Sequence, residues 1–135
     1  MHAQVGKRSP AYLTAMGKSL LAFDDPAAVR ERFGEREFQH PTAPAVRDVT
    51  DLLAQLGVVR DRGYAIDDEE LEIGLRCVAA PIVGVSGAVV GSVTASCAAS
   101  RVSREQIHWL APRVIACAAT INAEIGAPRE PATAS

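Results

Sequence analysis

Residues 63–101 read GYAIDDEELEIGLRCVAAPIVGVSGAVVGSVTASCAASR, and the fold is decided in this stretch. Two apolar runs, residues 75–83 and 88–96, flank the short connection Gly84-Val85-Ser86-Gly87. Its glycines allow the positive φ that hairpin turns often need, so the pattern predicts an antiparallel hairpin. An acidic segment, residues 67–72, directly precedes the first run.

One face of this hairpin has an unusual composition. A symmetric hairpin about the turn places Cys77 opposite Thr94 and Leu75 opposite Ser96. Side chains alternate across a strand, so these four side chains share one face. The face is small and partly polar, and it follows the acidic segment. It therefore predicts the wall of a small-molecule pocket rather than part of a hydrophobic core.

The composition limits the class of protein. A length of 135 residues indicates one domain, and 48% hydrophobic but only 4% aromatic residues predict an aliphatic core. The net charge of −2 and the scattered arginines argue against DNA binding by this chain. No run is long enough to span a membrane, and no signal peptide is present. Three cysteines without a C-x-x-C motif suggest reduced thiols, so we expect a cytoplasmic protein with no membrane partner.

Three helices are predicted before the hairpin. Thr14 is a suitable N-cap for the first, Asp25 caps the second, and the third ends at Gly63. Gly17 lies inside the first helix, where glycine lowers helix stability. We therefore expect another group to approach the backbone closely at Gly17.

A long helix is predicted after the hairpin. Ser103 and Gln106 have the spacing of a capping box, and an apolar stripe continues to Ile125 before Gly126 ends the helix. The predicted class is α+β, an antiparallel sheet packed against helices. The predicted organisation is a lead-in at 1–10, one domain at 11–126 and a disordered tail at 127–135.

Three segments carry more specific motifs: LTAMGKSLLAF at 13–23, GYAIDDEELEIGLRCVAAPI at 63–82 and SVTASCAASR at 92–101. They resemble motifs of the IclR family of bacterial transcriptional regulators. The first is similar to its A-x-G-K-A-L-L-A helix. The second is similar to its G-Y-A-x-D-x-x-E segment followed by G-x-R-C-x-A-A-P-[IV], and the third to its S-V-S-G-P-x-x-R strand end. The resemblance covers residues 6–126 in the same order and spacing.

The resemblance implies a GAF-like effector-binding domain that binds a small organic acid and controls the oligomeric and DNA-binding state of a homodimer or higher homo-oligomer. It implies no enzyme activity, no catalytic residue, no metal and no cofactor. DNA contact would come from an N-terminal winged helix-turn-helix, which does not precede Gly6 here. We also expect the leading strands to be missing, so that the sheet is incomplete and strand 88–96 has an exposed edge through which copies associate. The ligand-binding positions carried over are the backbone of Ala15 and Met16 and the side chains of Asp67, Leu75, Cys77, Thr94 and Ser96.

The acidic segment has no EF-hand spacing, so we expect most of its carboxylates to be solvated and only Asp67 to reach a ligand.

Two alternative functions of the site stay open. Cys77 suggests a cysteine-dependent enzyme on a GAF-like scaffold, although no histidine lies in the hairpin or the acidic segment to activate it. Met16 replaces a smaller residue of the family, and if it fills the pocket the domain is an oligomerisation module with a vestigial site.

Overall fold

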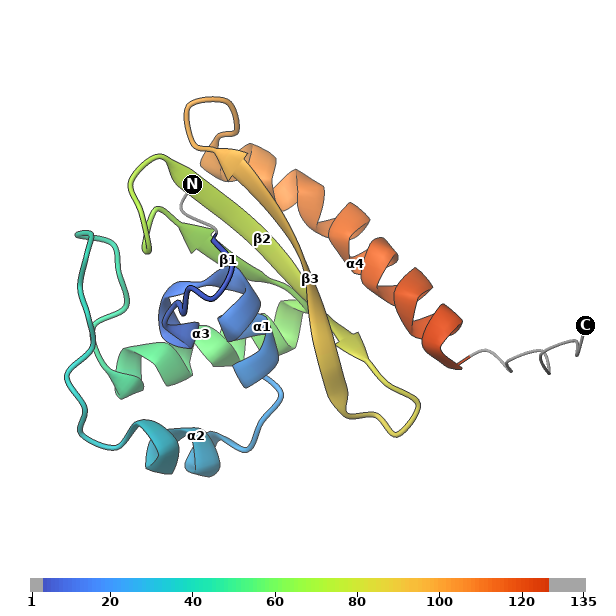
Figure 1. Ribbon diagram of the computed structural model, residues 1–135, viewed down its shortest axis with the longest axis horizontal. Helices are drawn as coiled ribbons and strands as arrows, with labels where there is room; N and C mark the ends of the chain where they lie inside the picture. The colour runs from blue at the N-terminus through green and yellow to red at the C-terminus, as the bar shows by residue number, and fades with distance from the viewer. Residues whose placement is uncertain (1–3, 127–135) are drawn as a thin grey trace, which may run out of the picture.

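The chain forms an α+β domain in a computed structural model that describes residues 4–126 (Figure 1). The elements are η1 (Ala11–Leu13), α1 (Ala15–Leu21), α2 (Pro26–Phe33), α3 (Val49–Arg62), β1 (Ala65–Asp68), β2 (Leu75–Val83), β3 (Val89–Ala98) and α4 (Arg104–Gly126). The predicted class and the long C-terminal helix are confirmed. The tail at 127–135 lies outside the described residues. No helix within 4–126 is long and apolar enough to cross a membrane.

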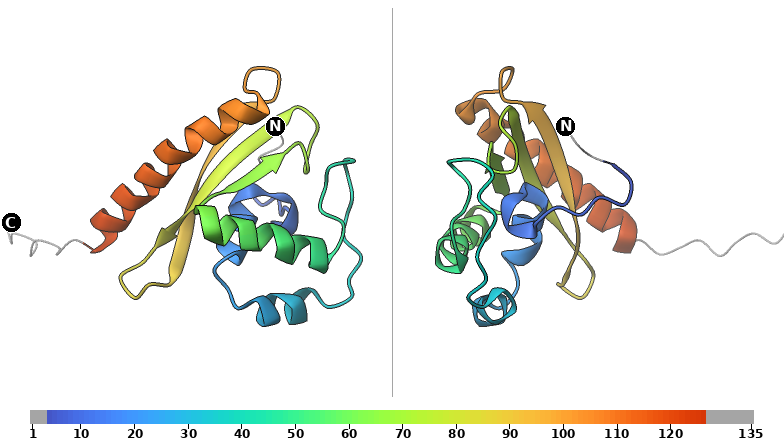
Figure 2. Two further views of the ribbon diagram at one scale, coloured as in Figure 1. Left: turned by 180° about the vertical axis from the view of Figure 1, so that it is seen from behind. Right: turned by 60° about the vertical axis from the view of Figure 1, so that its left-hand side comes forward.

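The three strands form one antiparallel sheet in the order β1-β2-β3, which is not closed. Helix α4 covers one face, and α1 and α3 lie on the other, with α2 outside them (Figures 1 and 2). Alternation along β2 divides the core accordingly. Val78 and Ala80 pack with the apolar stripe of α4, whereas Cys77 and Ala79 pack with the helices of the opposite layer.

The hairpin exists, but its predicted register is wrong by two residues. Cys77 lies opposite Ser96 rather than Thr94. One residue of the difference arises because β3 begins at Val89, opposite Val83, and the other arises from a register shift next to Val83. A shift of two leaves every side chain on its original face, so the predicted grouping of side chains survives the error.

The predicted helix boundaries are confirmed by their caps. The Thr14 hydroxyl accepts a hydrogen bond from the backbone N–H of Gly17 at 3.0 Å. Ser103 and Gln106 form the reciprocal capping box, with N–O distances of 2.9 and 3.1 Å. Gly63 ends α3 with a φ of 86°, a left-handed conformation that favours glycine.

Gly17 marks the expected close backbone approach. A Cβ atom at this position would lie 2.2 Å from the carbonyl oxygen of Ala11. The short helix η1 therefore packs directly against the backbone of α1. Gly57 in α3 is different, since the nearest atom to its added Cβ is a side-chain nitrogen of Arg60 at 3.8 Å.

These two glycines make a matched test of the η1–α1 contact. Gly17→Ala should lower the free energy of unfolding by about 1–3 kcal/mol, because the overlap outweighs the gain in helix propensity. Gly57→Ala should raise it by up to about 1 kcal/mol, because alanine favours the helix and meets no obstacle. Urea unfolding measures both. Two changes of the same sign would contradict the close contact at Gly17.

Candidate ligand-binding site

A cavity of about 490 Å³ lies between α1, the segment before η1 and one face of the sheet. All seven residues selected from the sequence line it: Ala15, Met16, Asp67, Leu75, Cys77, Thr94 and Ser96. The cavity is also lined by Gln4, Lys7 and Ser9, which lie in the segment that the sequence analysis predicted to be a lead-in. Among the described residues that line it, Lys7 carries the one positive charge. No local pattern could have identified Lys7, because its position depends on how the lead-in returns to the sheet.

Asp67 lies in strand β1, not in a loop, and it pairs with Cys77. Its side chain is buried, and one oxygen accepts a hydrogen bond from the backbone N–H of Glu70 at 2.9 Å. Burial raises the pKa of Asp67 to about 6, and the hydrogen bond from Glu70 opposes part of the shift. The carboxyl group is therefore ionised at neutral pH and takes up a proton in mildly acidic solution.

The β2–β3 wall presents a hydroxyl group that lacks a partner. The Thr94 hydroxyl oxygen is buried and, within residues 4–126, makes no hydrogen bond. Across the hairpin the Cys77 thiol lies 3.4 Å from the Ser96 hydroxyl. A buried hydroxyl without a partner destabilises the protein by roughly 1–3 kcal/mol, so a ligand that bonds to Thr94 would recover this energy.

The first turn of α1 forms the opposite side of the cavity. The amides of a first helical turn have no partner within the helix. Thr14 accepts hydrogen bonds from the backbone N–H groups of Gly17 and Lys18, whereas those of Ala15 and Met16 have no partner within residues 4–126. Both residues line the cavity, so it combines free donors on one side with a semi-polar strand face on the other.

A buried ion pair holds α1 in this position. Lys18 is 1% exposed, and its ammonium group donates to the carboxylate of Glu70, which is 6% exposed. Lys18 also donates to Gln55 of α3 at 2.7 Å. Glu70 accepts from the backbone N–H of Val46 at 3.1 Å and, through its carbonyl, from the Thr42 hydroxyl at 2.7 Å. Burial raises the pKa of Glu70, while Lys18 lowers it in part.

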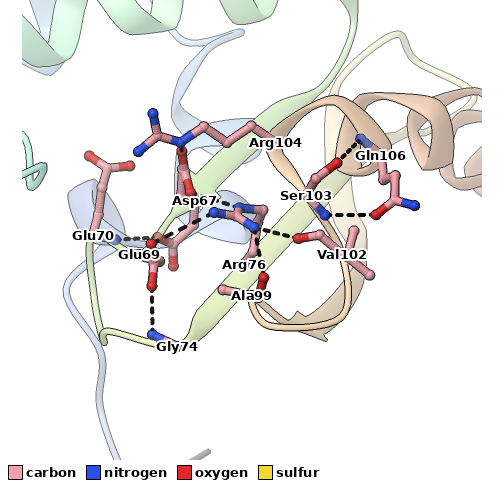
Figure 3. A network of polar contacts seen from close by, with 11 residues as sticks. Asp67, Glu69, Glu70, Gly74, Arg76, Ala99, Val102, Ser103, Arg104 and Gln106 are labelled. Atoms are coloured by element: carbon pink, nitrogen blue, oxygen red, sulfur yellow. Dashed lines mark hydrogen bonds and ion pairs between the residues drawn. The ribbon is translucent and has the colours of Figure 1, made fainter.

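The other acids are also engaged, so the expectation of a solvated acidic segment is wrong. Arg76 is buried and donates to Asp68 at 2.7 Å. A carboxylate oxygen of Glu69 lies 3.7 Å from the Arg76 guanidinium group (Figure 3). Arg104, at the start of α4, binds the second oxygen of Asp68 at 2.8 Å. Glu69 also accepts from the backbone N–H of Gly74 at 2.9 Å. The carboxylates of the acidic segment are therefore bound by arginine side chains and backbone amides rather than by solvent alone.

Neither a metal site nor an activated cysteine is assembled. Among the described residues, no three His, Cys, Asp or Glu side chains are arranged to hold a metal ion. Burial raises the pKa of the Cys77 thiol, which disfavours the thiolate. His40 bonds to the carbonyl of Ala45 at 3.0 Å and His108 to the Tyr64 hydroxyl at 2.7 Å.

Comparison with known proteins shows the family to which the chain belongs. Residues 1–123 match the family described as Bacterial transcriptional regulator IclR C-terminal. The chain belongs to the IclR family. It is 35% identical over 126 residues to the HTH-type transcriptional regulator KdgR of Dickeya chrysanthemi, covering 93% of this chain and 41% of that protein. It therefore spans less than half the length of this relative.

Two solved structures have a fold similar to that of this chain. The C-terminal domain of Escherichia coli KdgR is 34% identical, with a TM-score of 0.82 over 90% of this chain and 74% of that one. The inducer-binding domain of PobR from Acinetobacter was solved as a double mutant in complex with 3-hydroxybenzoic acid. It has a TM-score of 0.78 over 87% of this chain and 67% of that one, and at 24% identity it shows the fold alone.

Asp67 should give this IclR-family domain a measurable pH dependence. The folded state holds the Asp67 proton more tightly than the unfolded state does, so stability falls as pH rises from about 4 to about 6. The shift corresponds to about 2–3 kcal/mol. Asp67→Asn keeps a hydrogen-bond acceptor for Glu70 but removes the titration. Its stability relative to the parent should therefore increase by about that amount between pH 4 and pH 7.

Urea unfolding at a series of pH values measures this difference. Asp61→Asn is the control, since Asp61 is exposed on α3 and its replacement should leave the pH profile of the parent unchanged. Parallel stability curves for the parent and Asp67→Asn would contradict the burial of an ionised Asp67.

Proposed function

We propose that this chain is the ligand-sensing domain of an IclR-type regulator and that it binds a small organic acid in the cavity beside α1. One observation carries the proposal: the buried, unpartnered hydroxyl of Thr94 lines a cavity of about 490 Å³. Unpartnered buried polar atoms are rare in folded proteins, and a ligand is one of the few explanations for them. The cavity is large enough for a compact carboxylic acid.

The arrangement of donors suggests how the acid binds. Its carboxylate lies at the amides of Ala15 and Met16, where free N–H groups favour an anion. Lys7 adds a positive charge to the same cavity. The remainder of the ligand lies against Leu75, Cys77, Thr94 and Ser96, and a hydroxyl or hydrated carbonyl group bonds to Asp67.

Two alternatives have less support. An oligomerisation module with a vestigial pocket requires Met16 to fill the site, but Met16 is 46% exposed and the cavity beside it is open. A cysteine-dependent enzyme requires an activated thiol, but burial raises the pKa of Cys77, and His40 and His108 bond elsewhere. We therefore propose sensing without catalysis.

In the wider protein, ligand occupancy would be transmitted to a DNA-binding part that this chain does not supply. The net charge of −2 and the dispersed arginines argue against binding of duplex DNA by this chain alone. We propose that the regulator works in the cytoplasm as a homo-oligomer and that residues 11–126 are its sensing unit.

Thr94→Val tests the proposal with two changes of opposite sign. Valine is close in shape and removes the unpartnered hydroxyl, so the free chain should gain up to about 1 kcal/mol of stability. Ligand binding should weaken, because the ligand loses its hydrogen bond to Thr94.

A thermal-shift screen of small carboxylic acids identifies the ligand. At a hundred times its dissociation constant, the ligand should stabilise the parent by about 2.7 kcal/mol.

Matched variants separate the pocket from general effects. Asp67→Ala and Ser96→Ala should each reduce the ligand-induced shift, whereas Ser100→Ala, on an exposed turn, should not. If Thr94→Val, Asp67→Ala and Ser96→Ala all respond to the ligand as the parent does, the ligand binds elsewhere. If no carboxylic acid shifts the parent, the proposed ligand class is wrong.

A further inference from the structure

The cavity beside α1 has charges of opposite sign in its wall. Among the described residues that line it, Lys7 carries the one positive charge and Asp67 the one carboxyl group. Lys7 is exposed, so solvent screens much of its charge, whereas Asp67 is 1% exposed. The charge of Asp67 therefore acts strongly on any ligand group that lies beside it.

The Asp67 carboxyl group has no counter-ion of its own among the described residues. Lys18, the buried base behind the cavity, donates to Glu70 and Gln55. Asp67 accepts from the backbone N–H of Glu70 at 2.9 Å, which is a neutral donor (Figure 3). Burial raises the pKa of Asp67 to about 6, and of the two neighbouring charges Glu70 raises this pKa further whereas Lys18 lowers it. The ion pair thus leaves the charge of Asp67 uncompensated.

The other elements around Asp67 bring no further charge to it within residues 4–126. The register of the sheet places Asp67, Cys77 and Ser96 in one row on the cavity face, and β3 contains no charged residue. Burial raises the pKa of the Cys77 thiol, so the thiol stays protonated at neutral pH. Helix α3 reaches this region through Gln55, which is neutral and bonds to Lys18. A ligand therefore meets an isolated carboxylate on β1 and only neutral groups along the rest of the row.

This isolated carboxylate restricts which ligands fit. An ionised carboxylate only accepts hydrogen bonds, so a favourable ligand group beside it must donate one. A second carboxylate at the same place would put two like charges together in a partly desolvated cavity. On the basis of the proposed function, we propose that Asp67 selects the ligand by charge: the site binds a monocarboxylic acid that carries a hydrogen-bond donor such as a hydroxyl group, and it rejects a dicarboxylic acid. The single carboxylate of the ligand lies away from Asp67, on the side of Lys7.

The same contact links ligand binding to a proton. A hydrogen bond from the ligand favours the ionised form of Asp67, and by reciprocity the ionised form binds that ligand more tightly. Binding of a hydroxy acid therefore releases a proton near pH 6. An acid of the same length without the hydroxyl group offers Asp67 no donor, so its binding releases no proton. The affinity of the hydroxy acid, relative to that of the matched acid, rises as the pH increases through about 6.

Matched sets of acids test this selectivity. Each set contains a straight-chain monocarboxylic acid, its terminal hydroxy derivative and the dicarboxylic acid of the same length, and the sets run from two to six carbons. Titration calorimetry at pH 7 measures their binding to the parent and to Asp67→Asn. In a set that binds to the parent, the hydroxy acid should bind at least about tenfold more tightly than the dicarboxylic acid. In Asp67→Asn this ratio should fall below about threefold, because the amide carries no charge to repel a second carboxylate.

Lys7→Gln is the matched control. It removes a charge that attracts both monocarboxylic acids of a set, so their affinities should fall by the same factor and keep their ratio. A second measurement needs no variant. Calorimetry of the parent at pH 6, in two buffers with different enthalpies of ionisation, should show proton release on binding of the hydroxy acid and none on binding of the acid without the hydroxyl group.

The outcomes separate the selectivity of Asp67 from the proposed function. If no acid of any set binds to the parent, the proposed ligand class is wrong, and the selectivity is wrong with it. If acids bind but the dicarboxylic acid binds as tightly as the hydroxy acid, the cavity is a ligand site and Asp67 does not select by charge. The same conclusion follows if the ratio is unchanged in Asp67→Asn, or if the hydroxy acid takes up a proton at pH 6.

Discussion

The ion pair between Lys18 and Glu70 is the interaction on which the rest of the structure depends. Two charges removed from water require close contact and further hydrogen bonds, or their burial destabilises the fold. Here Gln55 accepts from the ammonium group and the backbone N–H of Val46 donates to the carboxylate, while Thr42 donates to the backbone carbonyl of Glu70. The pair thus joins α1, the middle of α3, the segment before α3 and the segment after β1 at one buried point.

This joint explains why the candidate site has its shape. Lys18 is one turn beyond Ala15, so fixing Lys18 fixes the free amides at the start of α1. Glu70 donates its backbone N–H to Asp67, so fixing Glu70 also orients the carboxyl group of the site. The two sides of the cavity are therefore positioned by one interaction behind it. This arrangement is suited to a sensor, in which ligand contacts on one side can be transmitted through a rigid element.

The sequence predicted the features that depend on local pattern. Capping at Thr14 and Ser103 was predicted because a cap is decided within four residues. The pocket wall of Cys77, Thr94 and Ser96 was predicted although the register was not, because an error of two residues preserves the face. The register itself depends on an irregularity beside Val83, which has no sequence pattern of its own.

The long-range contacts could not be predicted in the same way. Glu70 and Lys18 are 52 residues apart, and the local sequence around either residue does not indicate that the other is its partner. The composition of the acidic segment alone indicates a solvated loop, whereas its carboxylates form ion pairs with the buried Lys18 and Arg76 and with the exposed Arg104. The contribution of Lys7 to the cavity was missed for the same reason.

A double-mutant cycle on Lys18 and Glu70 tests this account most directly. Lys18→Met and Glu70→Gln should each lower the free energy of unfolding by about 3–5 kcal/mol, because each leaves the other group buried without its partner. The double variant should lose less than the sum of the two by more than about 1 kcal/mol. Losses that add within about 0.5 kcal/mol would show that the pair is not coupled and that α1 is held by other contacts.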